Sequence, residues 1–255
     1  MSLTGLGDTG EAQPPPALFP APEADTPTPG RRRGGEPQNG SPRNGPTQRA
    51  DAGQRAEVGR RAEAGRQLVF FGADAAEPSV ADLAGLLAGP GEVVRMGGTA
   101  RLSVQVDAAW RVHVLVAELA SRGLAASWEP TGDERHAVRT SYTRVLKPLA
   151  AAWLHGSTKR PPAAFHLTGR RLRLWLAAAG TPEPPDCFLL ALGADDQECW
   201  EPIGVALAAA GLAGTLLGPG DGGPAYRITG RRRLARLAEL VGGPPRATPA
   251  DAWPI

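Results

Sequence analysis

Arginine, serine and glutamine residues at alternating positions give this 255-residue sequence its clearest capacity for polar recognition. Arg101, Ser103 and Gln105 alternate with apolar residues, and this period of two predicts a half-buried strand with one polar face. Arg135 and Arg139 share one face of a second predicted strand. Arg and Gln side chains can form paired hydrogen bonds with the edges of guanine and adenine. The same pattern also fits an ordinary solvated strand, so the residues alone leave both interpretations open.

Other chemically active residue types are few and scattered. Two cysteines, Cys187 and Cys199, and four histidines show no metal-ligand spacing, and we expect both cysteines to be small buried residues. The formal net charge of +2 permits DNA binding through a local patch without requiring it. Almost all the positive charge is arginine, which a GC-rich coding sequence explains as well as selection for phosphate contacts does.

The elements that would hold these residues occur twice along the chain. The stretch from about residue 79 to 153 recurs, shifted by about 88 residues, between about 168 and 241. Asp107 falls on Asp195 and Arg139 on Arg227, and the phase holds across several elements, as a true repeat requires. We therefore expect two similar halves that fold as a pseudo-dimer within one chain.

Each half is predicted to contain a helix, one or two strands, a second helix, a hairpin and a third helix. Residues 124–129 and 135–140 form the first predicted hairpin, and 212–217 and 225–228 form the second. Side-chain oxygens before each helix are expected to act as N-caps. These are Ser79 and Thr168 for the first helices, Asp107 and Asp195 for the second, and Ser141 and Thr229 for the third.

The first helix of each half carries a motif of small and apolar residues. The first copy reads LAGLLAGPG over 83–91, and the second reads LRLWLAAAG over 172–180. Between them lie Trp153, the run TKRP over 158–161, and the pair LT at 167–168. Over about residues 79 to 243 these motifs resemble those of the LAGLIDADG homing endonucleases in their single-chain, two-motif form.

The resemblance implies an α+β fold in which two αββαββα halves pack their signature helices together and lay their curved sheets along the DNA major groove. Small residues allow such close packing, and one set is expected to face the other: Ala84, Gly85, Ala88 and Gly89 against Ala177, Ala178 and Ala179. The predicted boundaries are a first half over 67–157, a second half over 158–243 and a C-terminal tail over 244–255.

The N-terminal stretch over 1–66 is rich in Pro, Gly, Arg and acidic residues, with Phe19 as its only aromatic residue. Such a composition predicts disorder. The run over 31–33 is three arginines, which fits a solvated linker or a nucleic-acid-binding cluster. No run of about 18 apolar residues and no secretory signal pattern is present, so we expect a cytoplasmic protein without a membrane span.

The resemblance also places an acid just before the last glycine of each motif, where a carboxylate pair would hold Mg²⁺ for phosphodiester hydrolysis. Pro90 and Ala179 occupy these positions, and neither side chain can ligate a metal. No catalytic residue and no bound metal are therefore expected. The nearest acids, Glu92 and Glu183, are weak substitutes that we interpret as solvated loop charges.

Duplex DNA is the expected partner if the polar strands are used, and the first half should dominate because the equivalent second-half strands are mainly apolar. The predicted DNA-binding residues are Arg95, Arg101, Ser103, Gln105, Arg135, Arg139, Lys159, Arg160 and Arg227. Basic runs at helix starts, such as 170–171 and 231–233, are interpreted as solvated helix faces.

Three hypotheses remain open at this stage. The first is a catalytically degenerate relative of these endonucleases that retains DNA binding. The second is a protein-interaction scaffold without a nucleic-acid role, and the third is an active endonuclease that uses displaced acids. A pseudo-dimer has no need to dimerise, so we expect a monomer.

Overall fold

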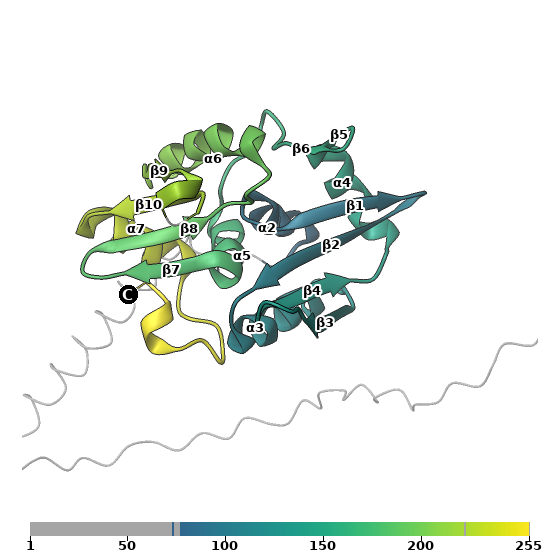
Figure 1. The fold of residues 1–255 in the computed structure, drawn as a ribbon, viewed down its shortest axis with the longest axis horizontal. Helices are drawn as coiled ribbons and strands as arrows, with labels where there is room; N and C mark the ends of the chain where they lie inside the picture. The colour runs from purple at the N-terminus through teal and green to yellow at the C-terminus, as the bar shows by residue number, and fades with distance from the viewer. Residues whose placement is uncertain (1–72, 74–76, 222, 255) are drawn as a thin grey trace, which may run out of the picture. The chain divides into compact units, whose positions relative to one another are not determined.

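The computed structural model describes residues 73, 77–221 and 223–254, which form two halves of similar architecture (Figure 1). The predicted N-terminal disorder lies outside the described residues. Each half contains a four-stranded antiparallel sheet with helices packed on it. The predicted α+β fold of two αββαββα halves is confirmed.

In the first half, the sheet order is β1-β2-β4-β3. Its elements are the 3-10 turn η3 (Val80–Leu83), α2 (Ala84–Ala88), β1 (Glu92–Met96), β2 (Thr99–Val106), α3 (Ala109–Ala120), β3 (Ala126–Pro130), β4 (His136–Thr140), the 3-10 turn η4 (Arg144–Leu146) and α4 (Lys147–Trp153). A small hairpin of β5 (Leu154–His155) and β6 (Thr158–Lys159) then leads to the second half.

In the second half, the sheet order β7-β8-β10-β9 repeats the pattern of the first. Its elements are α5 (Gly169–Ala179), β7 (Gly180–Glu183), β8 (Cys187–Ala191), α6 (Gln197–Ala209), β9 (Thr215–Leu217), the 3-10 turn η5 (Pro219–Asp221), β10 (Ala225–Thr229), α7 (Arg231–Val241) and the 3-10 turn η6 (Ala250–Ala252). Both hairpins lie where the alternation predicts them.

The signature helices α2 and α5 pack together with almost no side chain between them. A Cβ atom at Gly85 would overlap the backbone of Arg171, and one at Gly89 would lie 2.5 Å from Cδ1 of Trp175. For these two glycines, the predicted partners Ala177 to Ala179 are therefore wrong. Gly85 of α2 and its C-cap Gly89 meet the first two turns of α5 rather than its end.

Two of the six predicted N-caps form, both at signature helices. The Ser79 hydroxyl accepts a hydrogen bond from the backbone of Ala81, and that of Thr168 from Arg171. The other four are wrong, because each of these helices or turns begins later and is preceded by Ala108, Asp196, Thr143 or Gly230. The carboxylate of Asp107 accepts a hydrogen bond from the Arg111 side chain at 2.7 Å instead.

The segment predicted as a C-terminal tail packs onto the second half. Trp253 is buried, and its indole N–H donates a hydrogen bond to the carbonyl of Gly242 at 2.9 Å. The guanidinium of Arg173 lies over the same ring, 5.4 Å from its centroid. Residues up to Trp253 therefore belong to the folded second half. Among the described helices, none is long and apolar enough to cross a membrane.

Candidate nucleic-acid interface

The exposed face of the first sheet carries the predicted polar residues. On β2 the apolar residues are buried, whereas Arg101, Ser103 and Gln105 lie on the open face. The strand register sets Ser103 between Glu92 on β1 and Arg139 on β4. The predicted alternation of this strand is confirmed.

Four of the predicted DNA-binding residues line one hollow of about 340 Å³ beside the end of α2. They are Ser103, Gln105, Arg135 and Arg139. Pro90 and Glu92 complete its first-half wall, and the loop over 192–196 supplies a wall from the second half. We call this feature the first-sheet hollow.

The arginines of this face already have partners within the protein. Arg139 forms an ion pair with Glu129, and Arg101 lies over the ring of Tyr142 at 4.9 Å from the centroid. Arg135 lies 4.0 Å from the carboxylate of Asp133. Glu92, Asp195 and Asp196 also line the hollow. Its chemistry is therefore polar with both signs of charge, not uniformly basic.

The structure places three other predicted residues away from the hollow. Arg95 lies within β1, opposite Ala100, so it occupies the other face of the sheet. Arg160 is exposed, 3.8 Å from Glu198. Arg227 is on the second sheet, paired with Glu183 at 2.8 Å.

Lys159 is buried, which removes it from any predicted contact with DNA. Its ammonium donates hydrogen bonds to the carbonyls of Gly89 at 3.0 Å and Gly91 at 2.7 Å, and it pairs with Asp196 at 2.5 Å. These carbonyls lie where α2 ends, at the negative end of the helix dipole. Lys159 is thus a cap for the first signature helix, and the prediction that it contacts phosphate is corrected.

Arg111 gives the second signature helix an equivalent cap that the sequence analysis missed. Its guanidinium donates to the carbonyls of Leu176 and Ala177 at 3.1 Å and of Gly180 at 2.7 Å. Burial lowers the pKa of Arg111, while the nearby carboxylate of Asp107 raises it. No local signal could have found this contact, because the carbonyls lie 65 to 69 residues further along the chain.

The residues at the two helix ends do not fit a metal ion. Pro90 and Ala179 lack ligating side chains, and cationic side chains bind the neighbouring carbonyls. The interpretation of Glu92 and Glu183 as loop charges is wrong, because they lie in β1 and β7. The carboxylate of Glu183 is paired with Arg227, while Glu92 borders the hollow. Across 77–221 and 223–254, no group of three or more His, Cys, Asp or Glu residues is arranged to hold a metal. Hard cations such as Mg²⁺ need several oxygen ligands, and the carbonyl oxygens at these helix ends already accept hydrogen bonds from Lys159 and Arg111.

The open face of the second sheet is mainly apolar. Leu189, Ala191 and Leu217 lie on it, each partly exposed, beside the Arg227–Glu183 pair. The expectation that the first half offers more polar side chains is confirmed by this arrangement. The two sheets share a topology but not a surface.

No family model matches this chain, and no curated protein matches its sequence. Among solved structures, the homing endonuclease I-WcaI bound to its DNA recognition sequence is 12% identical with a TM-score of 0.48, over 63% of this chain and 78% of that one. I-DmoI in complex with DNA and Mn is 14% identical with a TM-score of 0.38, over 64% and 96% of the two chains. At these identities and TM-scores, the likeness concerns the path of the chain alone.

Proposed function

We propose that this protein binds duplex DNA through the open face of its first sheet and does not cleave it at the ends of the signature helices. The observation that carries the proposal is the convergence of Ser103, Gln105, Arg135 and Arg139 on one hollow. A two-stranded β-ribbon fits the major groove, where Arg and Gln can distinguish base edges. The resemblance of the sequence motifs to homing endonucleases supports the same partner.

The ion pairs on this face are compatible with binding. The side chains of Arg139 and Glu129 are 39% and 58% exposed, and exposed pairs of this kind contribute only about 0 to 1 kcal/mol. A phosphate or a guanine edge can replace the glutamate as the partner of Arg139 at little cost. The ion pairs orient the arginines but leave them able to exchange the carboxylate for a DNA group.

The proposal that DNA is not cleaved rests on charge at the helix ends. Hydrolysis by a bound metal requires carboxylates there to hold the ion and activate water. Lys159 and Arg111 instead place positive charge at the carbonyls of Gly91 and Gly180. A divalent cation at the same point would be repelled by both side chains.

Fluorescence anisotropy of the full chain with a labelled duplex of random sequence, measured across a salt series, tests DNA binding. We expect affinity to fall steeply as salt rises, because counterions are released from neutralised phosphates. A selection from a random duplex library then reports any preferred sequence. No salt-sensitive binding to any duplex at low ionic strength would contradict the proposal.

Supercoiled plasmid incubated with Mg²⁺ or Mn²⁺ tests the absence of cleavage. We expect the plasmid to remain intact. Cleavage that is lost on chelation, and lost in Glu92→Gln or Glu183→Gln, would show instead that displaced acids form an active site. Arg144→Gln serves as a control for nuclease contamination, since Arg144 is exposed and far along the chain from both acids.

A second function has one observation in its favour. The open face of the second sheet presents Leu189, Ala191 and Leu217, which suit contact with another protein better than contact with DNA. The interaction-scaffold hypothesis therefore stays in place as the alternative. Duplex binding by the full chain, lost in a first-sheet variant, would decide against it.

A further inference from the structure

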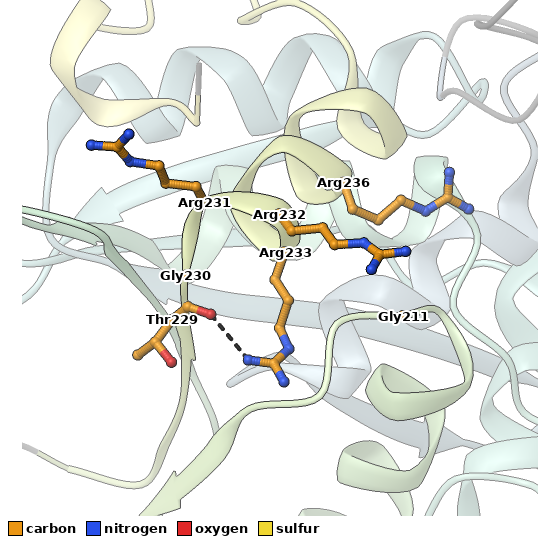
Figure 2. A pocket seen from close by; sticks show the side chains of 7 residues that line it. All are labelled: Gly211, Thr229, Gly230, Arg231, Arg232, Arg233 and Arg236. Atoms are coloured by element: carbon orange, nitrogen blue, oxygen red, sulfur yellow. Dashed lines mark hydrogen bonds between the residues drawn. The ribbon is translucent and has the colours of Figure 1, made fainter.

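A second hollow, of about 670 Å³, lies at the start of α7 and is lined by arginines (Figure 2). Its lining residues are Gly211, Thr229, Gly230, Arg231, Arg232, Arg233 and Arg236. No acidic residue is among them. We call this feature the α7 hollow.

The arginines of the α7 hollow are loosely engaged. Arg233 donates to the backbone carbonyl of Thr229 at 3.2 Å, and Arg236 pairs with Glu239 at 2.8 Å. Arg231 is almost fully exposed and lies 4.0 Å from Asp186. Figure 2 shows Arg232 and Arg236 extending in the same direction while Arg233 turns toward Thr229. The hollow is therefore an open and strongly basic surface.

Helix stability does not explain these arginines. The N-terminus of an α-helix is the positive end of its dipole, where cationic side chains are unfavourable. Arg231, Arg232 and Arg233 nevertheless occupy the first turn of α7, after Gly230, which provides no side-chain cap. The helix is held instead by burial of Leu237 and Val241. The arginine run thus carries an electrostatic cost at the start of the helix.

The fold does not require most of them either, because the other half has an arginine at only one of the four equivalent positions. At the repeat shift of 88 residues, Arg231 and Arg232 correspond to Thr143 and Arg144. Arg233 and Arg236 correspond in the same way to Val145 and Pro148, which border a mainly apolar pocket. The basic character is specific to the second half.

We propose that the α7 hollow binds phosphate groups of a nucleic-acid backbone. Guanidinium groups pair with phosphate oxygens through two parallel hydrogen bonds, and several on one surface suit a chain of phosphates. A lipid surface fits less well, because the apolar face of α7 is buried in the protein and cannot enter a membrane. The proposal does not depend on base recognition by the first sheet.

The position of the hollow fits a contact with DNA flanking the first-sheet site. Gly180 begins β7 directly after α5, whereas Thr229 pairs with Cys187 at the opposite end of the second sheet. The α7 hollow therefore lies at the outer end of that sheet. A duplex that extends past the first-sheet hollow could reach it.

The test compares the triple variant Arg232→Gln, Arg233→Gln and Arg236→Gln with the matched control Arg144→Gln, Lys147→Gln and Arg246→Gln. Both remove three positive charges, and the control residues are exposed outside the α7 hollow. Duplex binding is measured by anisotropy across a salt series. We expect the triple variant to bind about tenfold more weakly and the slope of log affinity against log salt to fall by about 2 to 3. The control should keep the slope of the natural protein.

Competition by a free polyphosphate tests whether the α7 hollow binds phosphate groups. Inorganic tripolyphosphate should compete with the duplex for the natural protein and lose this effect in the triple variant. An unchanged slope in the triple variant, or equal losses in both variants, would overturn the inference.

Loss of binding to phosphatidylserine vesicles in the triple variant, with intact duplex binding, would assign the surface to a membrane instead. A first-sheet variant, Gln105→Ala with Arg139→Gln, that binds normally while the triple variant fails would overturn only the proposed base recognition.

Thermal unfolding of the same variants guards against misfolding. Arg232 and Arg233 oppose the dipole of α7, and the partly exposed Arg236–Glu239 pair contributes little, so the triple variant should unfold at the same temperature as the natural protein or higher. A lower unfolding temperature would make the arginines structural and overturn the inference.

Discussion

The first-sheet hollow and the α7 hollow both present arginines, but they differ in what those arginines already bind. In the first, Arg139 is paired with Glu129 and the lining contains three acids. In the second, acids are missing from the lining: Arg233 bonds to a backbone carbonyl, and the acids near Arg231 and Arg236 lie outside the hollow. Side chains held by ion pairs favour discrimination between partners, and a lining with only positive charge favours affinity for any polyanion. The difference in charge matches the roles proposed for the two hollows, base recognition in the first half and phosphate binding in the second.

The largest effect is expected when the packing of α2 against α5, which joins the two halves, is disrupted. Gly85→Leu would force a side chain into the backbone of Arg171, and we expect it to cost more than about 4 kcal/mol of folding stability. Both hollows should be lost together, as measured by chemical denaturation and duplex binding. Gly98→Leu, where a Cβ meets nothing within 4 Å, is the control. Equal tolerance of both changes would contradict the close packing.

The next largest effect is expected at the buried cations. Arg111→Met leaves the carbonyls of Leu176, Ala177 and Gly180 without this donor, at about 3 kcal/mol of unfolding free energy. Lys159→Met should cost a similar amount, because it also strands Asp196. Arg160→Met, beside Lys159 but exposed, should change stability by less than about 0.5 kcal/mol. Urea denaturation measures all three, and equal effects would refute the capping role.

Base discrimination should reside in the first-sheet hollow alone. Arg139→Gln is expected to reduce preference for the selected duplex over a random one by about 1 to 3 kcal/mol, the usual worth of a bidentate base contact. Arg232→Gln should weaken binding to both duplexes alike. Competition between the two duplexes measures the ratio. A preference that survives Arg139→Gln would place recognition elsewhere.

Removing the acid that pairs with Arg139 should strengthen the contribution of the first-sheet hollow to duplex binding. Glu129→Gln frees this arginine and removes a negative charge from the face, so duplex affinity should rise. The salt slope should increase by about 0.9 if Arg139 then meets a phosphate. Glu198→Gln, near exposed Arg160, is the matched control. Unchanged affinity in Glu129→Gln would mean that Arg139 faces away from the duplex.

The smallest expected effect concerns stability at α7. Arg232→Gln alone should leave the free energy of unfolding unchanged or raise it by about 0.3 to 1 kcal/mol, since it relieves charge at the helix start. Differential scanning calorimetry at low salt checks this. A clear loss of stability would indicate that Arg232 holds the fold.

The fold could be predicted well because its signals are local or periodic. The alternation of Arg101, Ser103 and Gln105 and the hydroxyl caps Ser79 and Thr168 depend on neighbouring residues and were confirmed. Because the two halves repeat, each element predicted in one half also predicted its counterpart in the other.

The candidate site was harder to predict, because its contacts join distant parts of the chain. Lys159 reaches carbonyls 68 and 70 residues earlier, so its basic side chain was mistaken for a phosphate ligand. Asp107 has a neighbour at i+4, Arg111, which draws its carboxylate away from the helix backbone. Glu183 likewise meets Arg227 only across the second sheet. The sequence predicts which charged residue types are present at the site, but not which groups they pair with.

The two buried cations also bear on whether the halves are interchangeable. Arg111 belongs to α3 of the first half and caps α5 of the second, whereas Lys159 and Asp196, which follow the first half, close the end of α2. Neither half supplies the counter-charge for its own central helix. A chimera that exchanged one half for that of another protein would leave a helix end bare. Each half therefore depends on the other for the cation that caps its central helix, so the two halves are not interchangeable modules.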